Sequence, residues 1–463
     1  MEAITLRQLL QAVNGQLLGE YEDLETLISG VDTDSRNIHE GGLFLPLIGE
    51  RFDGHVYIDS ALEAGAIGCL TTQEREHYRN DKFYIKVENT ELALRDLAIW
   101  YKQQFPIPFI AVTGSVGKTT AKDMIASVLG VKFQVLKTEG NFNNNIGLPL
   151  TVLRLKPGHE ICVLEMGMDT VGEIDYLGGI VKPDVGVITN IGDAHIERLG
   201  SQENIFKAKC ELLPHIQPDG ILVANGDDRW LKTLEGNAPV TTVFCGRGEQ
   251  LAYNAQVVDG DGTSFIRCRM HTPSWDSNTE IPALGEHMIY PATIAAAVAE
   301  HFGLTKEEIE QGLTQFVPTR MRMNIVKRAQ GITILDDTYN ANPQSMRAAV
   351  SVLNDSRSEK KVAVLGDMLE LGMFSQALHT GVGEYIGKTD IGCLIAIGPQ
   401  AEAIAQGARD TGVPEVYHYE DKESAKGMLR SMIAADTTFL LKASRGMHME
   451  ELTEYLIEQT EEG

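Results

Sequence analysis

The sequence predicts an α/β protein arranged in three segments, and three observations lead to this prediction. At 463 residues the chain is too long for one ordinary hydrophobic core, so two or three domains are expected. From Pro108 onward, apolar runs ending in Gly, Asp or Asn alternate with helical stretches, which is typical of a parallel sheet covered by helices. A second alternating block begins near residue 321, which indicates a sheet of its own.

The first segment, residues 1–106, contains short mixed elements. Leu6, Leu9, Leu10 and Val13 are spaced as on one face of an amphipathic helix. Strands are expected around "GGLFLPLIG" and "AIGCLTT", and a helix in "TELALRDLAIWYKQQF". That helix runs into "PIP" at 106–108, which marks a linker because proline stops a helix.

The second segment, residues 107–320, holds the first alternating block. "FIAVTG" is expected to be a buried strand, followed by a helix over 118–129. Further strands are expected in "EICVLEMG", "DVGVITNIG", "GILVANGDD" and "VTTVFCG". A hairpin is expected in "AQVVDGDGTSFIRCRM" and helices across 285–316.

The third segment, residues 321–463, repeats the alternation. Its strands are expected in "ITILDDTYNANP", "KVAVLGDM", "CLIAIGP", "EVYHY" and "TFLLKASRG". The final "EQTEEG" is expected to be a solvated tail.

Composition limits the function classes. Hydrophobic content of 43% and charged content of 23% match a soluble globular protein, and there is no run of 18 apolar residues. We therefore expect neither a membrane span nor a signal peptide, and a cytoplasmic location. A net charge of -25 argues against nucleic acid or anionic membrane as a partner. Small-molecule substrates and a monomer are expected as well, although neither follows from the charge. The six scattered cysteines are expected to be buried thiols.

"VTGSVGKTTAKDM", residues 112–124, reads as a phosphate-binding loop that is one glycine short. The usual spacing G-x-x-x-x-G-K-[ST] would place its first glycine at Val112, and Gly114 is the nearest candidate. A strand before the loop and a helix after it would aim backbone N–H groups at a nucleotide phosphate. The residues expected to bind ATP here are Thr113, Gly114, Ser115, Val116, Gly117, Lys118, Thr119 and Thr120.

A magnesium ion is expected beside the phosphates. Lys118 would neutralise the β- and γ-phosphates, and the Thr119 hydroxyl would join the Mg²⁺ shell. Magnesium also takes one or two carboxylates, and Glu165 follows the next strong strand. His195 again follows a strand, so both are candidate metal ligands, although each taken alone would read as a polar strand end.

Several motifs occur together in a fixed order: "TGSVGKTT", "EGNFNNNIGLPLTVL", "EMGM", "TNIGDAHIERLGS", "AKCEL" and "DDTYNANPQSM". This order resembles that of the Mur ligases of bacterial cell-wall synthesis. The shortened loop looks like this family's own version. From residue 336 onward, "DDTYNANPQSM", "VLGDMLELG" and "LLKASRGMHME" are most similar to the members that add D-alanyl-D-alanine.

The resemblance implies three domains: residues 1–106 for the UDP end of the substrate, 107–320 for ATP, and a C-terminal Rossmann-like ligase domain at 321–463. In "DTDSR" and "RFDGH", the residues that resemble a UDP-binding set are Ser35, Arg36, Asp53, Gly54 and His55. Asn143 and Asn144 are expected to position phosphate oxygens.

In the third segment, the residues that resemble the part meeting ATP when the domains close are Arg320, Asp337, Tyr339, Asn340 and Asn342. The last three, with Lys442, Ser444 and Arg445, are also expected at the peptide and amine substrates. Family members often carry G-x-H-N-x-x-N where adenine is read. Here the segment is "GEHMIYP", which keeps Gly285 and His287 but has Met288 and Pro291, so adenine recognition is left open.

Lys209, in "FKAKCEL", resembles the lysine that is carbamylated in many Mur ligases. Carbamylation needs a neutral amine, so a desolvated lysine with a lowered pKa suits it. Lys207, two residues earlier, is the competing assignment.

The resemblance implies an ATP-dependent, ADP-forming ligase that adds D-Ala-D-Ala to UDP-MurNAc-tripeptide through an acyl phosphate. The catalytic residues would be Lys118, Glu165, His195 and Lys209. The tripeptide's third residue, L-lysine or meso-diaminopimelate, stays open. Alternatives are another Mur-type or folylpolyglutamate-type ligase with a different amine, and a nucleotide-regulated binding protein that does not turn over.

Overall fold

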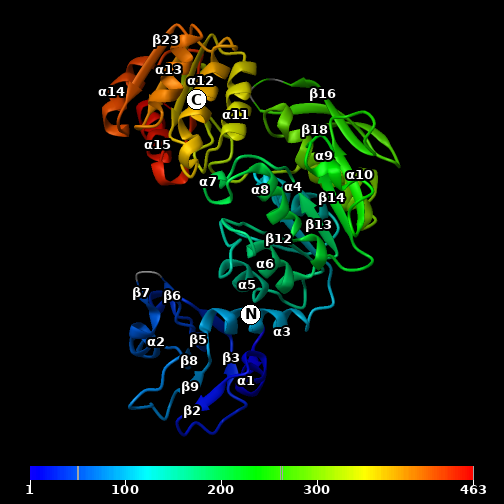
Figure 1. Ribbon diagram of the computed structural model, residues 1–463, viewed down its shortest axis with the longest axis vertical. Coiled ribbons are helices and arrows are strands. Elements are labelled where there is room, and N and C mark those ends of the chain that lie inside the picture. The colour runs from blue at the N-terminus through cyan, green and yellow to red at the C-terminus, as the bar shows by residue number, and fades with distance from the viewer. Residues whose placement is uncertain (50–51, 261, 263, 462–463) are drawn as a thin grey trace. The chain divides into compact units, whose positions relative to one another are not determined.

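The computed structural model describes residues 1–49, 52–260, 262 and 264–461 (Figure 1). The chain is grouped into two compact units. The first comprises residues 1–111, 133–168 and 173–184, and the second comprises residues 112–132, 169–172 and 185–463. None of the helices in the described part of the chain has both the length and the apolar run that a membrane crossing requires.

The N-terminal part of the first unit is built on a five-stranded sheet. Its order is β2-β9-β8-β5-β4, with only β2 antiparallel to its neighbour. The strands are β2 (Gln16–Leu18), β4 (Gly30–Asp32), β5 (Gly42–Phe44), β8 (Gly68–Thr71) and β9 (Phe83–Lys86). Two short antiparallel pairs join β1 (Ile4–Thr5) to β3 (Leu27–Ile28) and β6 (Ile48–Gly49) to β7 (Phe52–Asp53). The helices are α1 (Leu6–Val13), α2 (Ile58–Glu63) and α3 (Thr90–Lys102).

The two helices expected in this segment are confirmed as α1 and α3. Helix α1 begins after Thr5, whose side chain accepts from the backbone of Gln8 in a capping box. Helix α3 ends at Lys102, three residues before the expected end at Phe105. Residues 103–105 instead form a turn that leads into Pro106.

The first unit also holds one edge of the central sheet, in the order β11-β12-β10. Its elements are β10 (Phe109–Thr113), β11 (Val135–Lys137), β12 (Ile161–Glu165), α5 (Gly147–Val152) and α6 (Glu173–Val181). The Tyr101 hydroxyl of α3 donates to the Leu155 carbonyl at 2.8 Å, which ties the N-terminal part to this edge. Strands β10 and β12 were expected; β11, only three residues long, was not.

The second unit continues the central sheet in the order β10-β13-β14-β15-β16-β17-β18, and β10 supplies residues to both units. The strands are β13 (Val185–Ile188), β14 (Ile221–Asn225), β15 (Thr241–Gly246), β16 (Tyr253–Gly260), β17 (Ile266–His271) and β18 (Asp276–Ile281). From β13 to β16 neighbours run parallel, and β16, β17 and β18 are antiparallel. The helices are α4 (Lys118–Leu129), α7 (Ile196–Leu199), α8 (Gln202–Cys210), α9 (Ile289–His301) and α10 (Lys306–Thr314).

The expected strand–helix alternation, the antiparallel pairing of β16 with β17 in the expected hairpin, and the helix over 118–129 are confirmed. Residues 261 and 263 of that hairpin lie outside the described residues. Strand β18 was missed because "DSNTEI" is largely polar. All six cysteines are free, five of them buried and Cys210 half-buried.

The C-terminal part of the second unit is a six-stranded sheet in the order β19-β20-β24-β21-β22-β23. All neighbours are parallel except β19 with β20. The strands are β19 (Asn324–Lys327), β20 (Thr333–Asp336), β21 (Lys360–Gly366), β22 (Cys393–Ile397), β23 (Glu415–Tyr419) and β24 (Thr437–Lys442). The helices are α11 (Pro343–Asp355), α12 (Ser375–Ile386), α13 (Glu402–Asp410), α14 (Lys422–Met432) and α15 (Glu450–Gln459).

The expected solvated tail is confirmed for Glu458, Gln459 and Glu461, which are exposed, and corrected at Thr460. Thr460 is buried, and the Arg328 guanidinium donates to its carbonyl and, at 3.1 Å, to its hydroxyl. The Glu461 carbonyl accepts from the Ala329 N–H at 2.9 Å. The chain end therefore packs against the turn before β20; residues 462–463 of the expected tail lie outside the described part.

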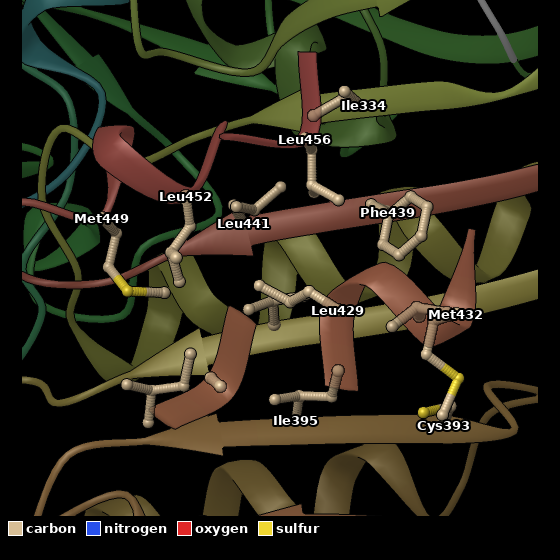
Figure 2. Close-up of a cluster of buried hydrophobic side chains, with 14 of the residues drawn as sticks. Ile334, Cys393, Ile395, Leu429, Met432, Phe439, Leu441, Met449, Leu452 and Leu456 are labelled. Atoms are coloured by element: carbon tan, nitrogen blue, oxygen red, sulfur yellow. The ribbon is translucent and has the colours of Figure 1, made fainter. Parts of the chain in front are cut away.

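The core of this C-terminal part explains why its strands are almost entirely apolar in sequence. Figure 2 shows Phe439 and Leu441 of β24 on the same face of the sheet as Ile395 of β22. Leu429 of α14 and Leu452 of α15 pack onto that face. Alternate residues of each strand reach one face, so burial on both faces requires the near-continuous apolar strands seen in the sequence.

Replacing Leu441 by alanine tests this core. Leu441 is fully buried, so Leu441→Ala should lower the free energy of unfolding by about 3 kcal/mol through lost burial and a residual cavity. The measurement is urea-induced unfolding followed by circular dichroism. Met373, which is 91% exposed in the same part of the chain, is the matched control, and Met373→Ala should change stability by less than about 0.5 kcal/mol. Equal effects of the two substitutions would contradict the burial of β24.

Candidate active site

The loop between β10 and α4 is held by the residues that follow β13. The Ser115 N–H donates to the Asn190 carbonyl at 3.0 Å, and the Val116 N–H donates to the Asn190 side chain at 2.9 Å. In return, the Val116 carbonyl accepts from the Thr189 hydroxyl at 2.6 Å and from the Asn190 amide at 2.9 Å. The loop conformation is therefore fixed by the protein itself before any ligand binds.

The two glycines of the loop are required for different reasons: close packing at Gly114 and a left-handed backbone at Gly117. Gly114 has φ +146°, and a Cβ there would lie 1.9 Å from the Thr189 hydroxyl oxygen. Gly117 has φ +78° in the left-handed region and stands directly before α4, with open space around it. Only glycine meets both demands without strain. Val112, where the usual motif has its first glycine, is buried in β10, so the shorter loop begins two residues later.

The first turn of α4 carries the expected lysine and hydroxyl. Lys118 Nζ donates to the Gly114 carbonyl at 2.9 Å, so its ammonium lies over the loop. Thr119 is buried, and Arg322 Nη2 lies 3.4 Å from its hydroxyl oxygen. The Arg322 guanidinium also stacks on the Tyr339 ring, 4.0 Å from the ring centroid. A helix N-terminus with two cations beside it is suited to bind a polyanion.

The arginine beside the phosphate loop is Arg322, not the expected Arg320. Arg320 was expected to meet the nucleotide, but its side chain is 81% exposed and lies 3.6 Å from Glu454. Arg322, two residues later, contacts Thr119 instead. The nucleotide role of Arg320 stays a prediction, and the geometry favours Arg322 for it.

Lys209 is fully buried near the end of α8. Burial, aided by the nearby Lys118 charge, lowers the pKa of Lys209 well below its ordinary value. Lys207, the competing assignment, is exposed and pairs with Glu203 at 2.7 Å across one helical turn. Of the two lysines, Lys209 therefore has the environment that favours a neutral, nucleophilic amine.

Glu165 ends β12 in the first unit and is only 2% exposed. Its Oε1 accepts from Asn143 at 2.8 Å, and its N–H donates to the Thr138 hydroxyl at 2.9 Å. Its Oε2 is buried and accepts no hydrogen bond from the described residues. Because an unpaired buried carboxylate oxygen is costly, this atom fits a cation ligand. Asn144 instead caps the turn into α5, accepting from Gly147 at 2.8 Å.

His195 stands directly before α7 with φ +62°. Its Nδ1 lies 2.9 Å from Glu370 Oε2 and 3.2 Å from Asp169 Oδ1. Neither oxygen is aligned with the ring N–H for a hydrogen bond, so the two carboxylates act on the ring through their charge at short distance. The imidazole lowers the pKa of Glu370 below its usual range.

A metal ion is not held by a ready-made cluster. Across residues 1–49, 52–260, 262 and 264–461, no three His, Cys, Asp or Glu side chains converge on one point. Magnesium keeps several waters and shares phosphate oxygens, so it does not need such a cluster. Within the first unit, Glu165 Oε2 has the chemistry of a ligand for such a cation. Within the second unit, His195 offers an imidazole nitrogen as a ligand.

In the C-terminal part, Lys442 and Asp337 form a buried pair, with Nζ 2.6 Å from Oδ2. Lys442 also donates to the Asn340 carbonyl at 2.8 Å. Burial lowers the pKa of Lys442, and the Asp337 carboxylate opposes that shift. Burial likewise lowers the pKa of His287, which feels both members of the pair. The structure thus brings three of the expected residues, His287, Asp337 and Lys442, into one electrostatic cluster.

The remaining expected residues of this part have structural contacts. Asn342 caps α11 by accepting from the Ser345 N–H at 2.9 Å, and Pro343 starts that helix as expected. The Ser444 hydroxyl accepts from the Leu369 N–H at 2.8 Å, and Arg445 pairs with Glu450 at 2.7 Å. Their substrate roles stay predictions.

The residues expected at the UDP end lie in the first unit. Arg36 is exposed and pairs with Asp34 at 2.7 Å. Hydrogen bonds from the side chain and the backbone N–H of Arg36 lower the pKa of Asp34 to about 2. Ser35 begins the same single turn, η1 (Ser35–Asn37). His55 Nε2 accepts from the Thr72 N–H at 3.0 Å, so its proton is on Nδ1, which donates to Asp53 at 2.6 Å. Arg51 of the motif lies outside the described residues.

Gly54 shows why a glycine separates Asp53 from His55. Its N–H donates to the Leu47 carbonyl at 2.8 Å, and a Cβ there would lie 2.7 Å from that carbonyl oxygen. The close approach of the two backbones excludes any side chain.

Sequence reasoning missed Thr189, Asn190, Arg322 and Glu370. The polar pair Thr189–Asn190 directly follows a strand, and that position was a usable signal. Nothing in the spacing distinguishes Arg322 from Arg320, and Glu370 is far from His195 in the sequence.

Three family models match the chain. The Mur ligase middle domain matches residues 112–299, the Mur ligase glutamate ligase domain residues 321–445, and the Mur ligase family catalytic domain residues 27–102. Among curated proteins, the UDP-N-acetylmuramoyl-tripeptide–D-alanyl-D-alanine ligase of Bacillus subtilis is 40% identical over 459 residues, covering 98% of both chains.

Solved structures agree with these matches. A crystal structure of MurF from Acinetobacter baumannii has a TM-score of 0.92 at 33% identity and covers 99% of both chains. MurF ligase from Thermotoga maritima in complex with ADP has a TM-score of 0.82 at 28% identity, covering 93% of this chain and 97% of its own.

Gly114→Ala tests the loop geometry. The new Cβ would displace Thr189 and hold a strained backbone, at a cost of about 1–3 kcal/mol, so binding of Mg·ADP should weaken about 5- to 150-fold. Isothermal titration calorimetry measures it. Gly158→Ala, where a Cβ meets nothing within 4 Å, is the control and should bind as the parent does. Unchanged affinity in Gly114→Ala would contradict the assignment of this loop.

Lys209→Met tests the buried amine through its pH dependence. The folded pKa lies below the unfolded value of 10.5, so above the folded pKa the unfolded chain binds the extra proton and stability rises with pH. The slope is up to about 1.4 kcal/mol per pH unit. Lys209→Met should therefore be more stable than the parent at pH 7, with a gain that shrinks toward pH 10.

The measurement is urea unfolding at several pH values in buffers freed of carbon dioxide, which keeps the amine unmodified. Lys207→Met, on the same helix but exposed, should change stability by less than about 0.5 kcal/mol and show no such trend. A pH-independent difference between parent and Lys209→Met would refute the burial argument.

Proposed function

The chain belongs to the Mur ligase family, and we propose that it uses ATP to join D-alanyl-D-alanine to UDP-N-acetylmuramoyl-tripeptide. The substrates in this proposal are those named for the Bacillus subtilis relative, which is matched over almost its full length. The domain boundaries near 106 and 320, the monomeric state and the cytoplasmic location belong to the same proposal. The third residue of the tripeptide is left to experiment.

One observation carries the nucleotide part of this proposal. The loop over residues 113–120 is held in place by Thr189 and Asn190 and has Lys118 and Arg322 beside the first turn of α4. Such an arrangement suits a triphosphate. The MurF ligase of Thermotoga maritima, which shares the fold at a TM-score of 0.82, is in complex with ADP.

The chemistry explains why cations gather there. A carboxylate is a poor electrophile, so the terminal carboxylate of the tripeptide would first attack the γ-phosphorus of ATP, releasing ADP and forming an acyl phosphate. The free amine of D-Ala-D-Ala would then attack the acyl carbon, expelling inorganic phosphate and releasing a proton. Both reactants of the first step are anionic, so charge neutralisation must dominate its catalysis.

The roles of the residues follow from where they lie. Lys118 and Arg322 would neutralise the transferring phosphoryl group, and the N-terminus of α4 would orient it. Thr119, Glu165 and His195 would hold magnesium, which would supply further positive charge at the phosphates. Asn143 would keep the Glu165 carboxylate in place.

Lys209 fits a modified role. A neutral amine can attack carbon dioxide to give a carbamate and a proton, and burial beside Lys118 lowers the pKa of this amine and so favours its neutral form. The carbamate would be an anion that helps to order the magnesium.

Lys118→Ala tests the proposed catalysis. Removing the ammonium should abolish ADP release driven by UDP-MurNAc-tripeptide plus D-Ala-D-Ala, a loss of at least about 10³-fold in kcat/KM. A coupled ADP assay measures it. Lys388→Ala, an exposed lysine just after α12, should keep parental turnover. Near-normal turnover of Lys118→Ala would refute the assignment of the phosphate loop.

The same assay identifies the amine. D-Ala-D-Ala, meso-diaminopimelate, L-lysine and glutamate are each offered with tripeptides ending in L-lysine or diaminopimelate. Only D-Ala-D-Ala should release ADP efficiently. A different preferred amine would favour another Mur-type or folylpolyglutamate-type ligase, and no ADP with any pair would favour a binding protein without turnover.

A further inference from the structure

Glu370 of the C-terminal part contacts His195 of the central part, and Glu370 has no role in the proposed reaction. Glu370 Oε2 lies 2.9 Å from His195 Nδ1, although the two residues are 175 positions apart. Both have left-handed backbones, with φ +63° and +62°. Gly372 belongs to the same contact, because a Cβ there would lie 2.9 Å from the Glu197 side chain.

The charges around the imidazole determine which nitrogen carries the proton. Nδ1 faces oxygens of Glu370 and Asp169, at 2.9 and 3.2 Å. A bare lone pair at Nδ1 would be repelled by both carboxylates, so the proton belongs there. Nε2 makes no hydrogen bond with any residue that the structure describes. The ring is thereby left with its free lone pair at Nε2.

The two carboxylates are not equivalent. Asp169 also pairs with Arg198 at 3.1 Å, so part of its charge is already neutralised. Among the described residues, His195 is the only ion-pair partner of Glu370. Glu370 also borders a cavity of about 650 Å³ whose lining includes Glu197, Glu402 and no lysine or arginine. Glu370 is therefore the carboxylate whose nearest charged partner is His195, with Arg198 contributing more weakly.

We propose that Glu370 is a positioning residue for His195, fixing the ring with its proton on Nδ1 so that Nε2 can bind the divalent cation. This rests on the proposed function, since it takes His195 as a metal ligand. A carboxylate beside Nδ1 of a metal-binding histidine favours the tautomer with its proton on that nitrogen and helps to orient the ring. The cation affinity of the central part thus depends on a residue of the C-terminal part.

The test measures metal binding rather than turnover. The full-length protein is titrated with Mn²⁺ in the presence of ADP, and free Mn²⁺ is read by electron paramagnetic resonance. Glu370→Gln should weaken Mn²⁺ binding about 10-fold or more without lowering the thermal unfolding midpoint. Glu402→Gln, which removes a carboxylate lining the same cavity, is the matched control and should bind Mn²⁺ as the parent does.

A double-mutant cycle separates positioning from a general loss of charge. His195→Ala should weaken Mn²⁺ binding at least as much as Glu370→Gln, and the double variant should be no weaker than His195→Ala alone. Fully additive effects, or an unchanged affinity in Glu370→Gln, would overturn the inference while leaving the proposed ligase function intact. An unchanged affinity in His195→Ala would remove His195 from the metal site and with it this inference.

Discussion

The site depends on one constraint: the loop before α4 must keep its shape with no ligand to hold it. The structure meets this constraint by pairing the Val116 carbonyl with two donors, Thr189 and Asn190, that follow the neighbouring strand β13. A carbonyl turned toward a phosphate would repel it, so engaging this oxygen elsewhere favours anion binding. The absence of a Cβ at Gly114 is what allows Thr189 to come so close.

The same helix links the central part to the C-terminal part. Thr319 donates to Asp123 of α4, and Arg322 contacts Thr119 one turn earlier. Between them Met321 has φ +62°, and Met323, with φ +54°, donates its N–H to Asp337 at 3.1 Å. Strained backbone in so short a segment persists only where its surroundings enforce it. Residues 319–323 therefore couple the phosphate loop to the Asp337–Lys442 pair.

The sequence predicted the elements that local physics decides and missed those that tertiary contacts decide. The helix over 118–129 was predicted to the residue, because Gly117 and the apolar periodicity mark its limits. Strand β18 escaped because it is polar and is stabilised by pairing with β17. Arg320 and Arg322 are chemically identical in the sequence. Which of the two arginines reaches Thr119 depends on the left-handed backbone of Met321 and Met323. The sequence pattern does not predict that conformation.

A charged Lys209 would be costly in this site because its ammonium is buried near a second cation. As an ammonium it is penalised twice, by desolvation and by the charge of Lys118, and among the described residues no carboxylate offsets these terms. As a neutral amine it avoids both penalties but contributes little. As a carbamate it would reverse the sign of its interaction with Lys118, turning repulsion into attraction inside a low-dielectric site. The burial of Lys209 beside Lys118 therefore supports the proposal that this lysine is carbamylated, since only the carbamate would turn the repulsion between the two side chains into attraction.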